Sequence, residues 1–356
     1  QSPTQQWIVD RLPYLWEEAA RLHQREIEER LLEAFFTLHD QPTALAVSRS
    51  LLSYSASTSM SVVAMYLAAH RLSVSLVEPT FDNLPDLLRR HGVVLSPLPE
   101  DVFADSATLR DRLDDDDSDV LYLVDPNNPT GSTLFRDGGK VFEQVLEHCR
   151  ERDRLLVLDF CFASFALRHA RHRRGDVYRQ LEESGVSYLA IEDTGKTWPM
   201  QDAKCAVLTA SADLYREIFD IHSTVLLNVS PFVLNVVTEY VRDSGNDGLA
   251  SVLNVQNTNR DQLSACVQGT DLTLPAPQVD TSVGWLRLGS SAPPASVLQG
   301  RLREHGLYVL PGTYFYWANP AAGERNLRVA LARDCTMFAA AMRLLRELLL
   351  DPIVMS

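Results

Sequence analysis

The chain has 356 residues, of which 46% are hydrophobic and 22% are charged, and its formal net charge is -14. This composition is typical of a soluble globular enzyme, and the length suggests one large domain with a smaller one beside it. The acidic balance argues against a nucleic-acid partner, because no basic stripe is available to neutralise phosphates. No apolar run approaches the ~20 residues needed to span a membrane, and there is no secretory signal. We therefore expect a cytoplasmic protein without a membrane partner.

Cysteine spacing and charge pattern argue against two further kinds of site. The five cysteines lie far apart and form no CxxC pair, so we expect neither a disulfide framework nor a metal site. The single basic run, at residues 168–174, includes two histidines. We interpret it as a solvated loop or a dimer-edge patch rather than a specific anion site.

The predicted elements begin with an N-terminal helical arm at residues 1–40. Apolar residues recur at helical spacing from Trp7 to Leu38, which predicts one or two amphipathic helices. A linker containing Pro42 is expected at 41–49. The strands expected next are 51–57, 74–77, 93–98, 120–124, 155–159, 188–192 and an antiparallel return at 206–209. The helices expected among and after them are 59–70, 84–91, 139–152, 177–184, 214–223, 231–243 and 248–267.

This alternation of short apolar runs and helices is typical of an α/β fold. It predicts a large domain over 41–270 with a mainly parallel, doubly wound sheet. A small α+β C-terminal domain is expected over 271–356. Its expected strands are 272–275, 283–288 and 327–331, and its expected helices are 295–305 and 336–350.

Polar side chains follow three of the short apolar runs. DPNNPTG contains Asn128, LLVLDF contains Asp159, and AIEDTGKTW contains Lys196. Because the carboxyl ends of parallel strands open onto one crevice, these three side chains should converge there. Such a set suits pyridoxal 5'-phosphate (PLP). The lysine would form the Schiff base, the carboxylate would keep the pyridine nitrogen protonated, and the amide would bond the ring oxygen.

Each of these residues also has a plainer interpretation. A structural arginine could also neutralise Asp159, Asn128 could belong to a bare turn, and a lysine after a strand is usually exposed to solvent. We favour the PLP site because it explains all three positions at once, and because a buried carboxylate without a partner is costly.

The phosphate of PLP requires a binding site of its own. Ser57 and Thr58 precede a helical stretch, where hydroxyl groups and free backbone N–H groups gather at the positive end of the helix dipole. Lys204, eight residues after Lys196, would complete this site as a point charge. Phe81 follows another strand and would stack on the pyridine ring. The alternative interpretation is that Phe81 is an ordinary residue of the hydrophobic core.

The order and spacing of Asn128, Asp159, Lys196 and Lys204 resemble the fold type I PLP enzymes of the aminotransferase class I/II group. NNPTG resembles that group's NPTG turn, and Lys204 stands where the group usually has a phosphate-binding arginine. The resemblance implies an aspartate-aminotransferase-like homodimer with its active sites at the subunit interface. It also implies that Arg328, in NLRVALAR, binds the substrate α-carboxylate, with Asn128 beside it.

A closer resemblance is to the PLP-dependent L-arginine oxidases/hydroxylases of the streptomycete enduracididine and azomycin pathways. It rests on SYSASTSM, EPTFDNLPDLLR, DPNNPTG, IEDTGKTWP and LRVALAR. It implies oxidation of L-arginine by O2, without metal or flavin, to 4-hydroxy-2-oxo-arginine and 2-oxo-arginine, with release of ammonia and peroxide. Antibiotic biosynthesis is the implied setting. In IEDTGK, the resemblance implies that Asp193 faces the substrate guanidinium.

Some positions depart from the related families. Phe162 stands three residues after Asp159, where aminotransferases usually have a tyrosine, and Cys161 stands where the arginine oxidases carry a serine. The segment SPTQQWIVDRLPYLW resembles a motif of the oxidases. In those enzymes, the lid that precedes this motif carries a histidine needed for hydroxylation. We expect such a lid ahead of Ser2, and none of the nine histidines is assigned its role.

Three functions are therefore compared. The first is an O2-dependent L-arginine oxidase/hydroxylase. The second is an aminotransferase acting on a basic or guanidino amino acid, which needs the same lysine and the same electron sink. The third is a catalytically silent partner protein that keeps the fold. The intact set of Asn128, Asp159, Lys196 and Arg328 argues against the third.

Overall fold

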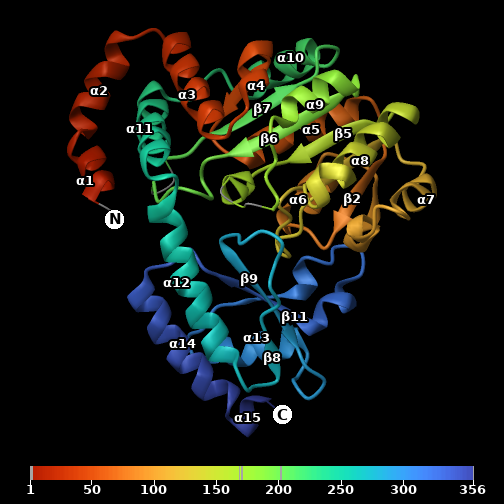
Figure 1. The fold of residues 1–356 in the computed structure, drawn as a ribbon, viewed down its shortest axis with the longest axis vertical. Coiled ribbons are helices and arrows are strands. Elements are labelled where there is room, and N and C mark those ends of the chain that lie inside the picture. Colours follow the sequence, from red (N-terminus) through yellow and green to blue (C-terminus); the bar gives the residue numbers. More distant parts are fainter. Residues whose placement is uncertain (1–2, 168, 170, 201–202, 356) are drawn as a thin grey trace.

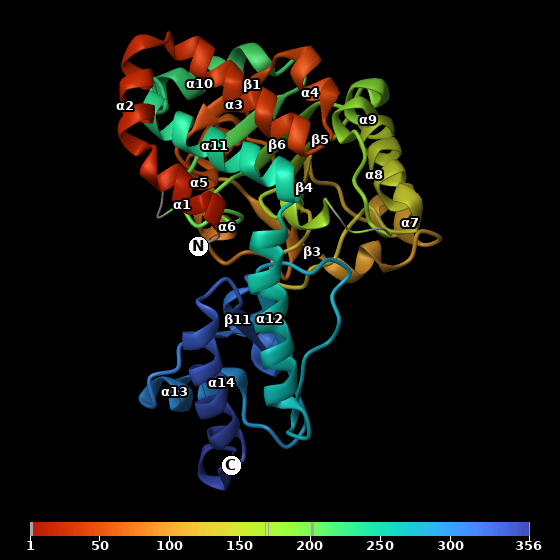
Figure 2. The same cartoon turned by 60° about the vertical axis from the view of Figure 1, so that its left-hand side comes forward.

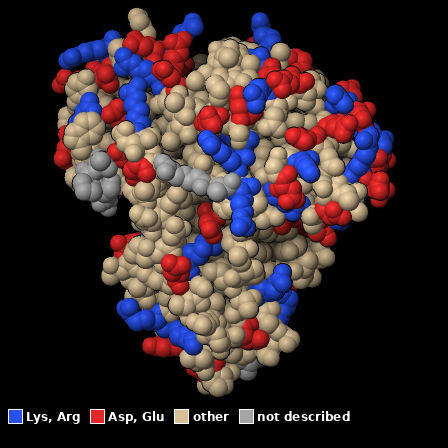
Figure 3. All heavy atoms as spheres, viewed as in Figure 1, with Lys and Arg blue, Asp and Glu red and all other residues tan. Residues whose placement is uncertain are grey.

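The computed structural model describes residues 3–167, 169, 171–200 and 203–355. The chain forms two parts, each with its own hydrophobic core (Figure 1). Helix α12 (Ala250–Val267) connects the two parts, because its residue Val252 belongs to the core of the larger part and its residue Leu263 to the core of the smaller part. The domain boundary at residue 270 stays a prediction. Acidic and basic side chains are interspersed on the face seen in Figure 3.

A seven-stranded sheet forms the centre of the larger part, in the order β1-β7-β6-β5-β4-β2-β3. Strand β7 is antiparallel to both its neighbours, and the pairs from β6 through β5, β4 and β2 to β3 are parallel. The strands are β1 (Ser50–Ser53), β2 (Val74–Glu78), β3 (Leu95–Pro99), β4 (Val120–Val124), β5 (Leu155–Asp159), β6 (Tyr188–Asp193) and β7 (Ala206–Ala210). Strands β4, β5 and β6 are buried along their whole length, as expected for parallel strands covered on both faces. The predicted α/β fold with a mainly parallel sheet is confirmed.

Helices surround this sheet, and their positions follow the predicted ones closely. They are α5 (Ala56–Ala69), α6 (Asn83–Arg90), α7 (Leu109–Asp114), α8 (Lys140–Glu151), α9 (Val177–Ser184), α10 (Tyr215–Val225) and α11 (Pro231–Asp247). Two short 3-10 helices, η1 (Glu100–Ala104) and η3 (Ala163–Ala166), follow β3 and β5. The sequence did not predict α7 or η1, because both are too short to show a helical period.

Three helices, rather than one or two, form the N-terminal arm: α1 (Pro3–Asp10), α2 (Leu12–Arg21) and α3 (Gln24–Leu38). All three pack against α11 (Figure 2). The linker predicted at residues 41–49 is wrong, because Pro42–Val47 form helix α4. Pro42 occupies the first turn of that helix, where a missing backbone N–H costs no intrahelical hydrogen bond.

The smaller part is an antiparallel four-stranded sheet, in the order β10-β11-β9-β8, covered by helices. Its strands are β8 (Leu272–Thr273), β9 (Val283–Leu288), β10 (Leu310–Pro311) and β11 (Asn326–Ala330). Its helices are α13 (Ala295–Glu304), α14 (Cys335–Leu349) and α15 (Pro352–Met355), with 3-10 turns η4 (Gly312–Tyr314) and η5 (Pro320–Arg325). Strand β11 carries Arg328, whose side chain donates a hydrogen bond to Asn128 in the turn after β4.

Candidate active site

The carboxyl ends of β4, β5 and β6 surround one small cavity. The turn after β4 contributes Asn128, the last residue of β5 is Asp159, and the segment after β6 contributes Lys196; all three side chains line the cavity. The structure therefore brings the amide, the carboxylate and the lysine of the predicted set together.

Most of the other predicted site residues lie in the same place. Those lining the cavity are Ser57, Phe81, Asp193 and Lys204. Thr58 and Arg328 are not among the lining residues. The backbone N–H of Thr58 donates to Ser55 Oγ at 3.3 Å. Arg328 reaches the site indirectly, because its Nη1 donates to Asn128 Oδ1 at 3.2 Å.

A helix N-terminus opens onto the cavity. Helix α5 begins at Ala56, with Ser55 as its N-cap, so the hydroxyl-rich start lies earlier than the predicted helix at residue 59. Ser55 and Ala56 also line the cavity. The sequence analysis missed Ser55, although serine before a helical run is a preferred N-cap. Free N–H groups at this end, together with the helix dipole, suit a phosphate group.

The Lys204 side chain packs against Gly195 and lines the cavity. A Cβ at position 195 would lie 2.6 Å from Lys204 Cδ, too close for any side chain. Glycine at this position therefore makes room for the second lysine.

Asp159 is a buried carboxylate, 2% exposed. Its Oδ1 accepts a hydrogen bond from the backbone N–H of Cys161 at 2.9 Å. Burial raises the pKa of Asp159, while this hydrogen bond and nearby Lys196 act in the opposite direction. No arginine within the described part of the chain pairs with Asp159. A cationic ligand group beside it would favour the ionised form.

Asp193 is a second buried carboxylate in the same cavity, 5% exposed. Burial raises its pKa to about 6, whereas the Gly195 backbone N–H and the charge of Lys196 lower it. Its Oδ1 has no hydrogen-bond partner among the described residues. This oxygen can accept a hydrogen bond from a donor group of a bound ligand.

Phe81 and Lys196 both line the cavity. The Lys196 Nζ atom is 5.7 Å from the centroid of the Phe81 ring, which follows β2. Phe81 therefore offers an aromatic face next to the lysine, on which a flat heterocycle attached to that lysine can stack. The residues present therefore fit PLP: a lysine for attachment, a buried carboxylate for the ring nitrogen, an aromatic face, and a helix N-terminus with Lys204 for the phosphate.

The Arg328 guanidinium is only partly paired in the structure. Its Cζ lies 5.1 Å from the ring centroid of Phe315, and its buried Nε has no partner among the described residues. Burial lowers the pKa of Arg328. Asn128 accepts from Arg328 through its oxygen, which leaves the two amide N–H donors of Asn128 for other partners.

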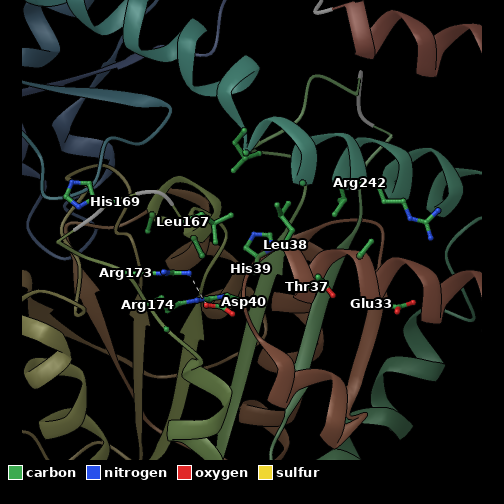
Figure 4. A pocket seen from close by; sticks show the side chains of 18 residues that line it. Glu33, Thr37, Leu38, His39, Asp40, Leu167, His169, Arg173, Arg174 and Arg242 are labelled. Atoms are coloured by element: carbon green, nitrogen blue, oxygen red, sulfur yellow. Dashed lines mark hydrogen bonds and ion pairs between the residues drawn. The ribbon is translucent and has the colours of Figure 1, made fainter.

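A larger cavity, of about 940 Å³, lies between α3, η3 and the end of α11 (Figure 4). None of the predicted site residues lines it. It is lined instead by part of the basic run, where Arg173 pairs with Asp40 at 3.1 Å. Arg174 is only 7% exposed and pairs with buried Glu192 at 3.2 Å, so at this residue the prediction of a solvated loop is wrong. Arg168 and Ala170 lie outside the described residues.

The sheet, the lysine after β6 and the carboxylate ending β5 define the class of fold type I PLP enzymes. The sequence profile of the aminotransferase class I and II family matches residues 18–342, and the chain belongs to this family. This match confirms the predicted family.

Two solved structures share the fold over most of both chains. MppP, soaked with the product 2-ketoarginine, is 33% identical with a TM-score of 0.89, covering 99% of this chain and 97% of that chain. A tetra mutant of Thermus thermophilus aspartate aminotransferase is 17% identical with a TM-score of 0.74, covering 90% and 85%. At this lower identity the similarity shows the fold alone.

One curated protein is also similar in sequence. LL-diaminopimelate aminotransferase of Syntrophobacter fumaroxidans is 25% identical over 238 residues, which are 64% of this chain. The match spans only 56% of that protein's length.

Of the helices described, none is long and apolar enough to cross a membrane. Among the described residues, no group of three or more His, Cys, Asp or Glu side chains is placed to hold a metal ion.

Proposed function

We propose that this chain is a PLP- and O2-dependent L-arginine oxidase/hydroxylase. Its products would be 2-oxo-arginine and 4-hydroxy-2-oxo-arginine, formed with release of ammonia and peroxide, without metal or flavin. The observation that carries the proposal is Asp193, a buried carboxylate that lines the same cavity as Lys196 and whose Oδ1 has no hydrogen-bond partner among the described residues. As the sequence resemblance implies, we also propose that the protein is a homodimer acting in antibiotic biosynthesis.

Arginine carries a charged group at each end, and the site offers a partner for both. Arg328 would bind the α-carboxylate through its unpaired guanidinium edge. Asp193 would bind the guanidinium of the substrate. The similarity to MppP supports this choice, because that protein was solved with 2-ketoarginine as its product. Conversion of arginine to that compound removes the α-amino group and oxidises Cα by two electrons.

The chain's residues would then act on Cα. When bound, PLP supplies an electron sink for the negative charge that develops at Cα. Lys196 would hold the cofactor and, once released by the substrate amine, would remove the Cα proton. Asp159 would keep the ring nitrogen protonated, and Phe81 would hold the ring in place. With O2 as the two-electron acceptor, arginine, O2 and water give 2-oxo-arginine, ammonia and hydrogen peroxide. The 4-hydroxy product requires a second O2 as a further two-electron acceptor and a second water, with a second hydrogen peroxide released.

The alternative is an aminotransferase acting on a basic or guanidino amino acid. It is favoured by the family match and by the similarity to a diaminopimelate aminotransferase. The oxidase is favoured by Phe162, which lines the cavity at a position where aminotransferases usually have a tyrosine. Consumption of oxygen in air, with arginine and without a 2-oxo acid, separates the two functions.

Asp193→Ala should lower kcat/KM for arginine by a factor that corresponds to about 2–4 kcal/mol of lost transition-state stabilisation, because a desolvated charged pair is lost. Citrulline has the same shape without the positive charge and should lose much less. Steady-state kinetics with both substrates measure the difference. Equal losses for arginine and citrulline would show that Asp193 does not recognise charge.

The pH dependence gives a second measure of the same contact. The pKa of Asp193 is raised to about 6, so its carboxylate is ionised above that pH and protonated below it. The attraction for a guanidinium is therefore lost as the pH falls through about 6. KM for arginine should rise over that interval in the wild type, and this rise should be absent in Asp193→Ala.

A further inference from the structure

Three side-chain donors from the turn at residues 127–132, which contains NNPTG, converge on one carboxylate oxygen. Asn127 Nδ2, Thr130 Oγ1 and Ser132 Oγ all donate to Glu100 Oε1. Glu100 begins η1, directly after β3, and is distant in sequence from the turn that it contacts. Burial raises the pKa of Glu100, and the three donors oppose that shift by favouring the charged form.

The same turn carries Asn128, which is 3% exposed and lies between two of the residues bound by Glu100. Within the turn, the backbone N–H of Asn127 donates to Ser132 O at 2.9 Å and that of Gly131 to Asn127 O at 2.7 Å. Asn127 Nδ2 also donates to Pro79 O at 2.9 Å, next to Phe81. The path of this turn therefore determines where the Asn128 amide lies.

We propose that Glu100 is a positioning residue, which holds the 127–132 turn so that Asn128 faces the cofactor and fixes Arg328. Glu100 does not line the cavity itself, so it acts only through these partners. A carboxylate suits this task, because it accepts several hydrogen bonds and strengthens each by its charge. The expected effect on the binding of PLP and of the substrate carboxylate rests on the proposed function. The contact between Glu100 and the turn does not.

The test compares Glu100→Ala and Glu100→Gln with Asp101→Asn as the matched control. Asp101 is the exposed neighbour of Glu100 and pairs with Arg112, away from the turn. In hydrogen exchange of the purified protein, Glu100→Ala should speed exchange of the Asn127 and Gly131 amides about tenfold or more, because the turn loses its charged acceptor. Asp101→Asn should leave both amides unchanged.

Ligand binding gives the second measurement. In the holoenzyme, Glu100→Ala should release PLP about tenfold faster and raise KM for arginine more than it lowers kcat, because Asn128 and Arg328 lose their fixed positions. It should also shift the pH midpoint of the bound cofactor's absorption band. Glu100→Gln keeps an acceptor oxygen and should recover part of each effect. A merely structural role would lower thermal stability without moving this midpoint.

The two possible failures are distinguishable. If Glu100→Ala does not fold, Glu100→Gln and Thr130→Val, which removes one donor, must show the same changes at smaller size. Wild-type exchange rates at Asn127 and Gly131 in the folded variants would overturn the inference, whether or not PLP binds. The inference would also be overturned by faster amide exchange in a variant whose rate of PLP release, absorption-band pH midpoint and KM for arginine are unchanged. A wild-type protein that binds no PLP would instead overturn the proposed function.

Discussion

Lys196→Ala should abolish covalent attachment of PLP and lower turnover of arginine to the background rate. The expected loss is the largest for any single residue, because in the proposed function Lys196 would both hold the cofactor and move the Cα proton. Borohydride reduction of the wild type, followed by peptide mapping, should place the modified lysine at position 196, and the variant should give no modified peptide.

Lys204→Ala is the matched control for that experiment, since Lys204 lines the same cavity. It should keep the reducible attachment at Lys196 and release PLP more readily, because only a contact to the phosphate is lost. A modified peptide at another lysine in Lys196→Ala would show that the assignment is wrong.

Asp159→Asn should lower kcat by about 10³-fold or more, equivalent to roughly 4 kcal/mol, while leaving the fold intact. The amide has nearly the same shape but cannot hold a proton on the ring nitrogen, so the electron sink weakens in the transition state. Circular dichroism should match the wild type, because Asp159 lies at the end of β5 and its backbone pairing is unchanged. Activity within tenfold of the wild type would contradict this role.

The sequence was sufficient to place the strands that position the site, for a physical reason. Residues 120–124 and 155–159 were predicted with the same bounds that the structure has. These strands are buried on both faces, so every residue is apolar and the first polar group marks the strand end. For this reason Asn128, Asp159 and Lys196 could be assigned to one cavity without a structure.

Contacts between distant segments could not be predicted in this way. Glu100 lies in an acidic stretch with no period, and only the fold brings its carboxylate to the NNPTG turn. Likewise, Arg174 resembles a surface residue within its basic run, yet the buried Glu192 of β6 is its partner. Short elements such as α4 were missed because one helical turn leaves no recognisable pattern.

Phe162 and Asp193 both line the cavity beside Lys196. An oxidase and an aminotransferase both need Lys196 and Asp159 for proton removal at Cα. They differ in whether the electrons pass to O2 or are returned to a 2-oxo acid.

The most direct measurement is therefore made with the holoenzyme and L-arginine in air, without any 2-oxo acid, while oxygen, peroxide and ammonia are followed together. We expect oxygen to be consumed over many turnovers, with one ammonia released for each arginine and 2-oxo-arginine among the products. Lys196→Ala and a reaction without oxygen should both stop this turnover. Arginine that reacts only after an amino acceptor is added, with oxygen unchanged, would contradict the oxidase and establish the aminotransferase.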